Sequence, residues 1–189
     1  MQRNIFRERD QISIIVFEVG WEQFAIELLD IKEIIQSGHV RKLPQSMDYI
    51  DGIYNYRGDI IHIINLHKKL NLDQYRLYHS KEELYDAGTA EEGSGKGPND
   101  ALNNNGGAKK NYIIIVTIDN NNIGFYADKI HNVSQINVED IVDLRPIFQT
   151  SVDAEYIKGV IKFKDRPRIL IDLTKILTEE EQSKIIKNE

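Results

Sequence analysis

The feature that most constrains the fold of this chain is an internal repeat. Tyr49-Ile50-Asp51-Gly52-Ile53 aligns with Tyr156-Ile157-Lys158-Gly159-Val160, and the register between the two copies continues without a gap to Leu70 and Leu177. Upstream of them, Ile26, Ile31 and Ile34 align with Phe125, Ile130 and Val133 at a second constant offset. Such self-similarity indicates two related structural units in one chain.

Both copies contain short apolar runs rich in β-branched residues, which are typical of β-strands. Turn-forming residues separate the runs, as hairpins require. The apolar runs are residues 12–17, 60–64, 112–118 and 169–171, and the turn signals are Gly20 and residues 57–59, 119–122 and 165–167. The chain is therefore predicted to be all-β, built of small barrels or a sandwich. Residues 28–35 fit either a helical turn or a turn that leads into a strand, and both alternatives stay open here.

We expect the whole chain, residues 1–189, to be a single domain with two β-subdomains, because each copy of the repeat alone is too short for a stable core. Packing the two together buries more surface and leaves a cleft, which is a common place for binding. The predicted parts are a first barrel subdomain at 11–72, a flexible polar insert at 73–110, a second barrel subdomain at 111–177, and a helix with tail at 178–189. The insert is predicted from its glycine-rich, asparagine-rich and charged composition, and the helix from the capping-box pattern of Thr178 and Glu181.

The composition excludes several classes of function. Lys and Arg number 24 against 30 Asp and Glu, which gives a formal net charge of −6 and disfavours nucleic-acid binding. The lack of cysteine excludes disulfides, thiolate metal sites and a Cys nucleophile. No histidine pair has metal-ligand spacing and no nucleophile elbow occurs, so we expect a binding protein or scaffold without catalysis, metal or cofactor. No apolar run is long enough for a spanning helix, and a cytoplasmic protein without direct membrane insertion is expected.

Ordered segments in both halves carry a resemblance to a known family. In the first half they are Phe24-Ala25-Ile26, Ile31-Lys32-Glu33-Ile34, the segment with Gly52-x-x-Asn55-x-Arg57-Gly58, and Ile63-Ile64-Asn65-Leu66. In the second half they are Ile123-Gly124-Phe125-Tyr126-Ala127-Asp128 and the segment from Tyr156 to Leu173. In this order and spacing, the chain resembles the CheW family of chemotaxis coupling proteins over residues 11–177, the insert excepted.

The resemblance implies two intertwined five-stranded β-barrels of SH3-like topology, followed by a short C-terminal helix. It also implies a bacterial adaptor, or scaffold, of signal transduction that links the cytoplasmic tips of chemoreceptors to the regulatory domain of the histidine kinase CheA. Members of this family have no catalytic activity. They lie in the cytoplasm with the receptor arrays at the inner membrane.

In the same family, the receptor's helical hairpin lies in the cleft between the barrels. The residues that match the receptor-binding positions are Ile31, Glu33, Gly52, Asn55, Arg57 and Val133. Arg57 is the strongest candidate, because a guanidinium can bind a carboxylate or amide with two hydrogen bonds, and Glu33 is its expected internal partner. An exposed hairpin arginine without a ligand is the alternative. The resemblance names no kinase-binding residue, although an exposed apolar strand end is the physical requirement.

The chain departs from the usual family pattern at Tyr56, His62 and Asn65, where Leu, Pro and Asp are common. The insert at residues 73–110 is the larger departure, because the family connects these two units more briefly. It supports an alternative function, in which a divergent CheW-like module regulates another histidine kinase or taxis branch through the insert. A small-molecule or nucleic-acid-binding barrel is a third alternative, which the acidic charge disfavours.

Overall fold

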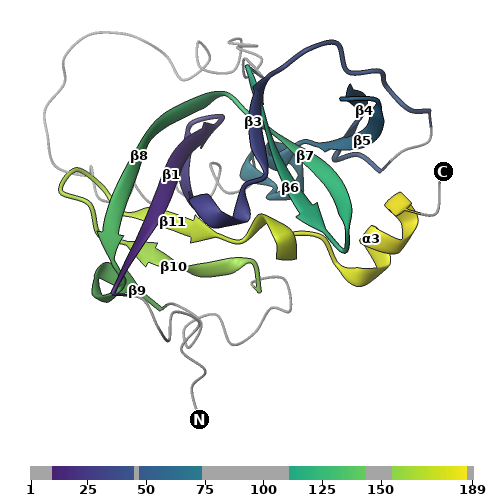
Figure 1. The fold of residues 1–189 in the computed structure, drawn as a ribbon. Coiled ribbons are helices and arrows are strands. Elements are labelled where there is room, and N and C mark those ends of the chain that lie inside the picture. Colours follow the sequence, from purple (N-terminus) through teal and green to yellow (C-terminus); the bar gives the residue numbers. More distant parts are fainter. Residues whose placement is uncertain (1–9, 45–46, 74–110, 144–154, 187–189) are drawn as a thin grey trace, which may run out of the picture.

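The computed structural model describes residues 10–44, 47–73, 111–143 and 155–186. Over these residues the chain forms two β-sheets with short helices between strands (Figure 1). The first half contains β1 (Gln11–Val19), β2 (Glu22–Glu27), the 3₁₀ helix η1 (Leu28–Asp30), β3 (Glu33–Gln36), β4 (Ile50–Tyr56), β5 (Asp59–Ile64) and α1 (Leu66–Lys69). The second half contains β6 (Tyr112–Ile118), β7 (Asn121–Ala127), β8 (Lys129–Asn137), η2 (Val138–Asp140), β9 (Ile141–Val142), β10 (Ile157–Ile161), β11 (Arg168–Ile171), η4 (Leu173–Lys175) and α3 (Glu179–Ile186).

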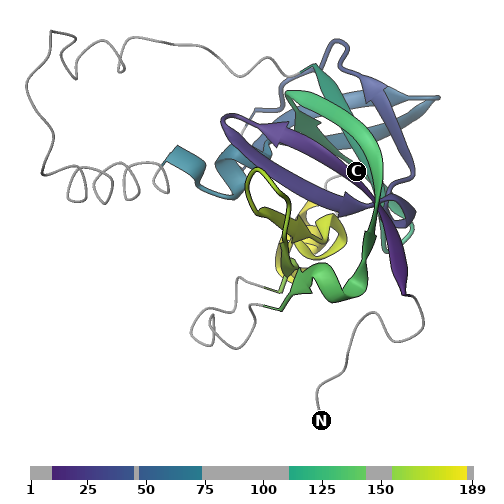
Figure 2. The same ribbon diagram turned by 90° about the vertical axis from the view of Figure 1, so that its left-hand side faces the viewer.

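Each sheet contains strands from both halves of the sequence. In sheet A the order is β8-β1-β2-β11-β10-β9, so the N-terminal hairpin β1–β2 lies among strands of the second half. In sheet B the order is β3-β6-β7-β5-β4, so the hairpin β6–β7 lies among strands of the first half. The turned view in Figure 2 shows the same two sheets packed against each other. The two repeats have therefore exchanged equivalent hairpins.

This exchange confirms the prediction of two intertwined β-units and shows where their boundaries lie. Sheet B is built within residues 33–127, whereas sheet A combines residues 11–27 with residues 129–171. The segments 11–72 and 111–177, which the sequence predicts as subdomains, therefore do not coincide with the sheets. The physical reason is that the outer strands of each repeat pair with the hairpin of the other, which covers edges that would otherwise stay open. Sheet A also gains a sixth strand, β9, beyond the five predicted.

Corresponding strand pairs repeat the same irregularity in both sheets. The register of β4 against β5 shifts at Asp51, and the register of β10 against β11 shifts at Lys158. Each shift is a β-bulge followed by a glycine with positive φ, +147° at Gly52 and +158° at Gly159. A β-carbon on Gly52 would lie 2.1 Å from the carbonyl oxygen of Arg41, so the close approach of these backbone segments requires glycine.

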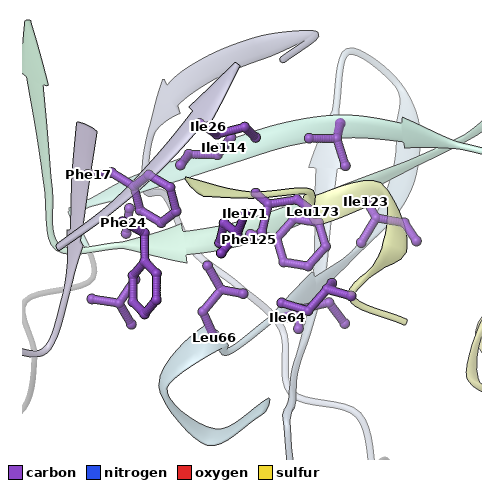
Figure 3. Packing of buried hydrophobic residues seen from close by; sticks show 14 of the residues in the cluster. Phe17, Phe24, Ile26, Ile64, Leu66, Ile114, Ile123, Phe125, Ile171 and Leu173 are labelled. Carbon is purple, nitrogen blue, oxygen red and sulfur yellow. The ribbon is translucent and has the colours of Figure 1, made fainter. Parts of the chain in front are cut away.

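The hydrophobic core has three parts. The largest, called the shared core here, lies between the sheets and contains Phe17 of sheet A with Ile114 and Phe125 of sheet B (Figure 3). A second cluster around Ile14 lies on the opposite face of sheet A, and a third around Ile63 lies in sheet B. Because neighbouring side chains of a strand point to opposite faces, each sheet contributes to the shared core and to a core of its own. The two sheets therefore form one packed body.

Most of the local predictions are confirmed. Strands β1, β5, β6 and β11 contain the predicted apolar runs. Residues 28–35, for which two alternatives stayed open, form η1 followed by β3. Helix α3 begins with the predicted capping box, since the Glu181 backbone N–H donates to Thr178 Oγ1 and the Thr178 N–H donates to the Glu181 carboxylate. The predicted insert lies outside the described residues except for Asp73.

Candidate functional site

A tight turn between β4 and β5 presents the strongest candidate residue. Its two residues, Arg57 and Gly58, have φ of +55° and +97°, and positive values at both positions are typical of a type I′ turn. Asn55 Oδ1 accepts a hydrogen bond from the Gly58 backbone N–H at 3.0 Å, which stabilises the turn. Asn, Asp and Gly are favoured at the first position of such turns. An arginine there is conformationally costly, which points to a role for its side chain.

Arg57 contacts Glu33, the first residue of β3. Its Nη2 lies 2.9 Å from Glu33 Oε1 and 2.8 Å from Oε2, as the sequence predicted for this pair. The buried Tyr56 donates its hydroxyl to the same carboxylate. The Arg57 side chain is 71% exposed, and its Nη1 and Nε have no partner among the described residues. One nitrogen thus fixes the guanidinium of a side chain that stays largely exposed.

The contacts around Glu33 also set its ionisation. The hydrogen bond from Tyr56 and the charge of Arg57 lower the pKa of Glu33, against an opposing effect of desolvation. The same hydrogen bond raises the pKa of Tyr56. Arg57 Cζ and Lys32 Nζ lie 5.3 and 5.9 Å from the centre of the Tyr56 ring, within cation–π range. The site is therefore an ionised carboxylate beside a guanidinium that can donate hydrogen bonds to a partner's carboxylate or carbonyl oxygen.

The other predicted site residues lie elsewhere. Gly52 is buried in the bulge of β4, where it shapes the backbone. Ile31 precedes β3 and packs, partly buried, against the shared core. Val133 lies on β8 of sheet A, opposite Ile15 of β1, and is 54% exposed. Because residues directly opposite each other share a face, Val133 lies at the edge of the face between the sheets. The structure thus brings together three of the predicted residues, Glu33, Asn55 and Arg57. It shows no contact of Gly52, Ile31 or Val133 with them among the described residues.

Tyr56 belongs to this site, although the sequence indicated it only as a departure from the family pattern. Its ring is buried against the third core cluster, and its hydroxyl reaches Glu33. Since a buried phenol needs a hydrogen-bond partner, a tyrosine beside an expected Arg57–Glu33 pair was a usable signal. The equivalent residue in the second repeat is Phe163, which has no such hydroxyl.

Sheet A also contains a buried ionic cluster that was not predicted from the sequence. Lys158 Nζ lies 2.8 Å from Glu27 Oε1, 2.7 Å from Asp30 Oδ2 and 4.0 Å from Asp172 Oδ2, and the lysine side chain is 8% exposed. Burial alone would lower the pKa of Lys158, but hydrogen bonds to Asp30 and Glu27 outweigh it and raise the pKa. One feature of the sequence could have indicated it. Asp51 and Lys158 occupy equivalent positions of the repeat, each before a glycine, but carry opposite charges. The cluster ties β2 and η1 to the second half of the chain.

The turn of sheet A that is equivalent to the β4–β5 turn is built from different side chains. Lys164 takes the place of Arg57 in the repeat. The carboxylate pair is made instead by Arg168, whose Nη1 and Nη2 bind the two oxygens of Asp165 at 2.9 and 2.7 Å. Arg168 Cζ also lies 4.2 Å from the centre of the Phe163 ring. The second turn therefore does not reproduce the exposed Arg57 site.

A groove lies beside helix α3, where the two halves of the chain meet. Glu181 accepts hydrogen bonds from Lys69 Nζ at 2.6 and 2.7 Å and from the Tyr49 hydroxyl at 2.7 Å, and these fasten α3 to the first half. The groove is lined by Lys69, Leu70, Asn71, Glu155, Tyr156, Thr174, Lys175, Ile176, Leu177, Thr178, Glu179 and Gln182. In the described part of the chain, no group of His, Asp and Glu has a metal-binding arrangement. Nor is any helix described there long and apolar enough to cross a membrane.

Comparisons with known proteins identify one family. The chain matches the family model described as CheW-like domain over residues 13–181. It is 29% identical over 176 residues to the Chemotaxis protein CheW of Treponema pallidum (strain Nichols). This match covers 93% of this chain and 88% of that protein. It is 24% identical over 171 residues to the Chemotaxis protein CheW of Klebsiella aerogenes, with coverages of 90% and 84%. The solved structure of the scaffolding protein TtCheW from Thermoanaerobacter tengcongensis is similar, with a TM-score of 0.61, 25% identity, and coverage of 90% of this chain and 96% of that chain.

Proposed function

The chain belongs to the CheW-like domain family, and we propose that it is a chemotaxis scaffold that couples the cytoplasmic tips of chemoreceptors to the regulatory domain of the histidine kinase CheA. The names of its relatives and of the similar scaffolding protein support a chemotaxis scaffold. From this family membership we infer that receptor and kinase are its two partners. Such a scaffold needs no catalytic group or cofactor, and it acts through the difference in its affinity for the kinase-on and kinase-off states of the receptor.

The observation that carries the proposal is the geometry of Arg57. A residue that disfavours positive φ occupies a turn where Gly or Asn would cost less, and its side chain is fixed by Glu33 with two nitrogens left for a partner. A receptor helix offers carboxylates and helix-terminal carbonyls as acceptors for them. Asn55 and Gly52 then act indirectly, by holding the turn and the bulge of β4. Ile31 and the exposed Val133 are proposed as apolar contacts at the edge of the shared core.

For the kinase, the sequence named no residues, and the structure offers an exposed apolar pair on η1. Leu28 is 38% exposed and its neighbour Leu29 is 72% exposed. A non-obligate interface needs an apolar centre within a polar rim, and Glu27 and Asp30 flank the pair in the chain. We therefore propose η1 as part of the kinase-binding surface. In the cell, the protein is proposed to lie in the cytoplasm with receptor arrays at the inner membrane.

The test is a calorimetric titration of the purified protein with the regulatory domain of CheA and, separately, with a cytoplasmic receptor fragment. We expect saturable one-to-one binding of the kinase domain. Arg57→Ala should weaken receptor binding about 5- to 150-fold, which corresponds to the loss of a charge-assisted contact of about 1 to 3 kcal/mol, and should leave kinase binding unchanged. Leu29→Ser should have the converse effect. Lys184→Ala, an exposed substitution on α3, serves as the control for both titrations.

Equal loss of both activities in Arg57→Ala would identify it as a folding residue, which a thermal melt of the same sample would show. If the folded wild-type protein binds neither partner, the scaffold proposal is wrong. The alternative would then stand, namely a divergent CheW-like module that regulates another histidine kinase or taxis branch through residues 73–110.

A further inference from the structure

The turn between β10 and β11 is a fixed tip that carries three exposed basic residues. They are Lys162, Lys164 and Arg166, and the one acid among them, Asp165, is bound to Arg168. We propose that this turn, residues 162–167, is a docking site for an acidic segment of a partner protein. It is called the basic tip below.

An internal clamp both neutralises the acid of the basic tip and fixes its shape. Arg168 is 12% exposed, binds Asp165 through both Nη atoms, and donates Nε to Gln23 Oε1 of β2 at 2.9 Å. Its guanidinium also stacks 4.2 Å from the centre of the Phe163 ring. The hydrogen bonds from Arg168 lower the pKa of Asp165 to about 2, so this pair is intact at neutral pH. A paired fork of this kind holds a turn in one geometry and reduces the entropy lost on binding.

The three remaining cations of the basic tip have no acidic partner. Among the described residues, no ion pair or side-chain hydrogen bond involves Lys162, Lys164 or Arg166. The neighbouring Asp140 accepts the backbone N–H of Lys162 through its carbonyl, while its carboxylate accepts from Asn137 Nδ2 at 3.3 Å. The chain as a whole has a formal net charge of −6. A local excess of positive charge attracts an anionic group, while the acidic remainder of the protein repels it. Together they steer an anionic partner to the basic tip.

The occupant is a carboxylate-rich polypeptide rather than nucleic acid or a membrane. A long polyanion that reached the basic tip would also meet the acidic remainder of the protein within the Debye length of about 8 Å at physiological ionic strength. Single-stranded nucleic acid also needs exposed aromatic faces for base stacking, whereas Phe163 packs partly buried against the second core cluster and Arg168 lies over one face of its ring. A single hairpin turn matches the size of a short acidic segment, whose separate carboxylates can pair with separate side chains.

This surface is distinct from the Arg57 site. The basic tip belongs to sheet A and the β4–β5 turn to sheet B, and Figure 1 shows the two hairpins on opposite sides of the molecule. The inference therefore does not rest on the proposed receptor or kinase contacts. It adds a third surface, through which an acidic partner could bind at the same time as either of them.

The test uses the full chain and a fluorescein-labelled synthetic peptide of alternating glutamate and glycine. Fluorescence anisotropy at about 25 mM NaCl should show saturable binding that weakens strongly at about 150 mM, because exposed charge pairs are screened by salt. Neutralising the basic tip in the triple variant K162Q/K164Q/R166Q should weaken binding at least about tenfold. The matched control K42Q/K129Q/K184Q removes the same charge from exposed lysines elsewhere and should change binding less than about twofold.

Three outcomes would overturn the proposal. One is the absence of peptide binding by the wild type at low salt, and a second is an equal loss in the control variant. The third is binding of an RNA oligonucleotide or of phosphatidylserine vesicles without binding of the peptide. A further variant, Asp165→Asn, distinguishes a fixed site from net charge alone, because it adds positive charge but releases Arg168. We expect binding about threefold weaker, and tighter binding would contradict a preorganised site.

Discussion

The two repeats have similar backbones, but the residue at the β-bulge is an acid in one repeat and a lysine in the other. In sheet B, the bulge residue Asp51 accepts a hydrogen bond from Asn65 Nδ2 at 3.1 Å and lies 3.7 Å from the exposed Lys68. In sheet A, the bulge residue Lys158 is surrounded by three carboxylates and is nearly buried. The same geometry thus holds a half-buried acid beside an exposed lysine in one half, and a buried cation among three carboxylates in the other. A duplicated unit can therefore keep the same β-bulge while the bulge residue makes different charged contacts in each copy.

The turns of the two hairpins differ in the same way. The β4–β5 turn offers one arginine that is paired with Glu33. The β10–β11 turn pairs its own acid with Arg168, and its other cations have no ion pair within the described part of the chain. One turn is therefore suited to a single oriented contact, and the other to contacts with several acidic groups on a fixed turn. Substitutions at equivalent positions of the two repeats test this contrast.

The largest effect is expected for Lys158→Met. Removing the lysine leaves the largely buried carboxylates of Glu27 and Asp30 without their cation, and breaking a buried ion pair costs about 3 to 5 kcal/mol. Thermal unfolding should show a fall in Tm of about 10 °C for a chain of this size. The deficit should shrink as pH falls toward 4, because protonation of the stranded carboxylates removes their repulsion.

The matched variant at the equivalent position is Asp51→Asn. The asparagine oxygen can still accept from Asn65, and the contact with Lys68 is exposed, so the free energy of unfolding should change by less than about 1 kcal/mol. Similar losses in both variants would mean that the two bulges are energetically alike, and the contrast drawn from their charged partners would be wrong.

The next effect concerns the glycines that follow the bulges. Gly52→Ala should lower the free energy of unfolding by about 2 to 4 kcal/mol, because the new methyl group would lie 2.1 Å from the Arg41 carbonyl oxygen, a backbone atom. In Gly159→Ala the nearest atoms, Ile141 Cγ2 and the Val142 oxygen, lie at 2.7 Å next to a two-residue strand that can shift more easily. Denaturant unfolding should therefore rank Gly52→Ala as the more damaging.

Gly58→Ala is the control for backbone conformation in this series. Gly58 has φ of +97°, but nothing lies within 4 Å of a β-carbon built on it. Its substitution should cost about 1 kcal/mol, from conformation alone. A cost at Gly52 no larger than that at Gly58 would contradict the role of the close approach to Arg41.

The sequence predicted the strands and turns well because these depend on local patterns. β-branched runs, the Arg57-Gly58 turn and the Thr178–Glu181 capping box each lie within a few residues, where side-chain alternation and capping determine the structure. The Arg57–Glu33 contact was predicted correctly, although only by the family resemblance, since no local rule joins residues on β3 and on the β4–β5 turn.

The exchange of hairpins could not be predicted from the residues alone. The repeats are similar, so β1–β2 carries an apolar pattern that would suit the outer strands of either half. Which partner it takes depends on the length and path of the connections and on the packing of the shared core around Phe17 and Phe125. The buried cluster of Lys158 follows from that exchange, because Glu27 reaches the lysine only when β2 lies beside β11.

The smallest change in stability, and the sharpest test of the turn comparison, is expected for Tyr56→Phe. This substitution gives the first repeat the residue that the second already has at Phe163, and it removes only the hydroxyl that donates to Glu33. Since the ring stays buried, Tm at neutral pH should change by less than about 2 °C. The pKa of Glu33 should rise toward the ordinary value of a glutamate, because the hydrogen bond from Tyr56 is the main cause of its lowering.

The sign of the pH dependence follows from this lowered pKa. In the wild type, the ionised Glu33 contributes stability above the ordinary pKa of a glutamate, and this contribution is lost as pH falls through the lowered value. In Tyr56→Phe the contribution is smaller and is lost at a higher pH, which NMR titration of the Glu33 side-chain carboxyl carbon measures directly. If Glu33 titrates at the same pH in both proteins, Arg57 alone holds the carboxylate, and Tyr56 serves only to pack, as Phe163 does in the other repeat.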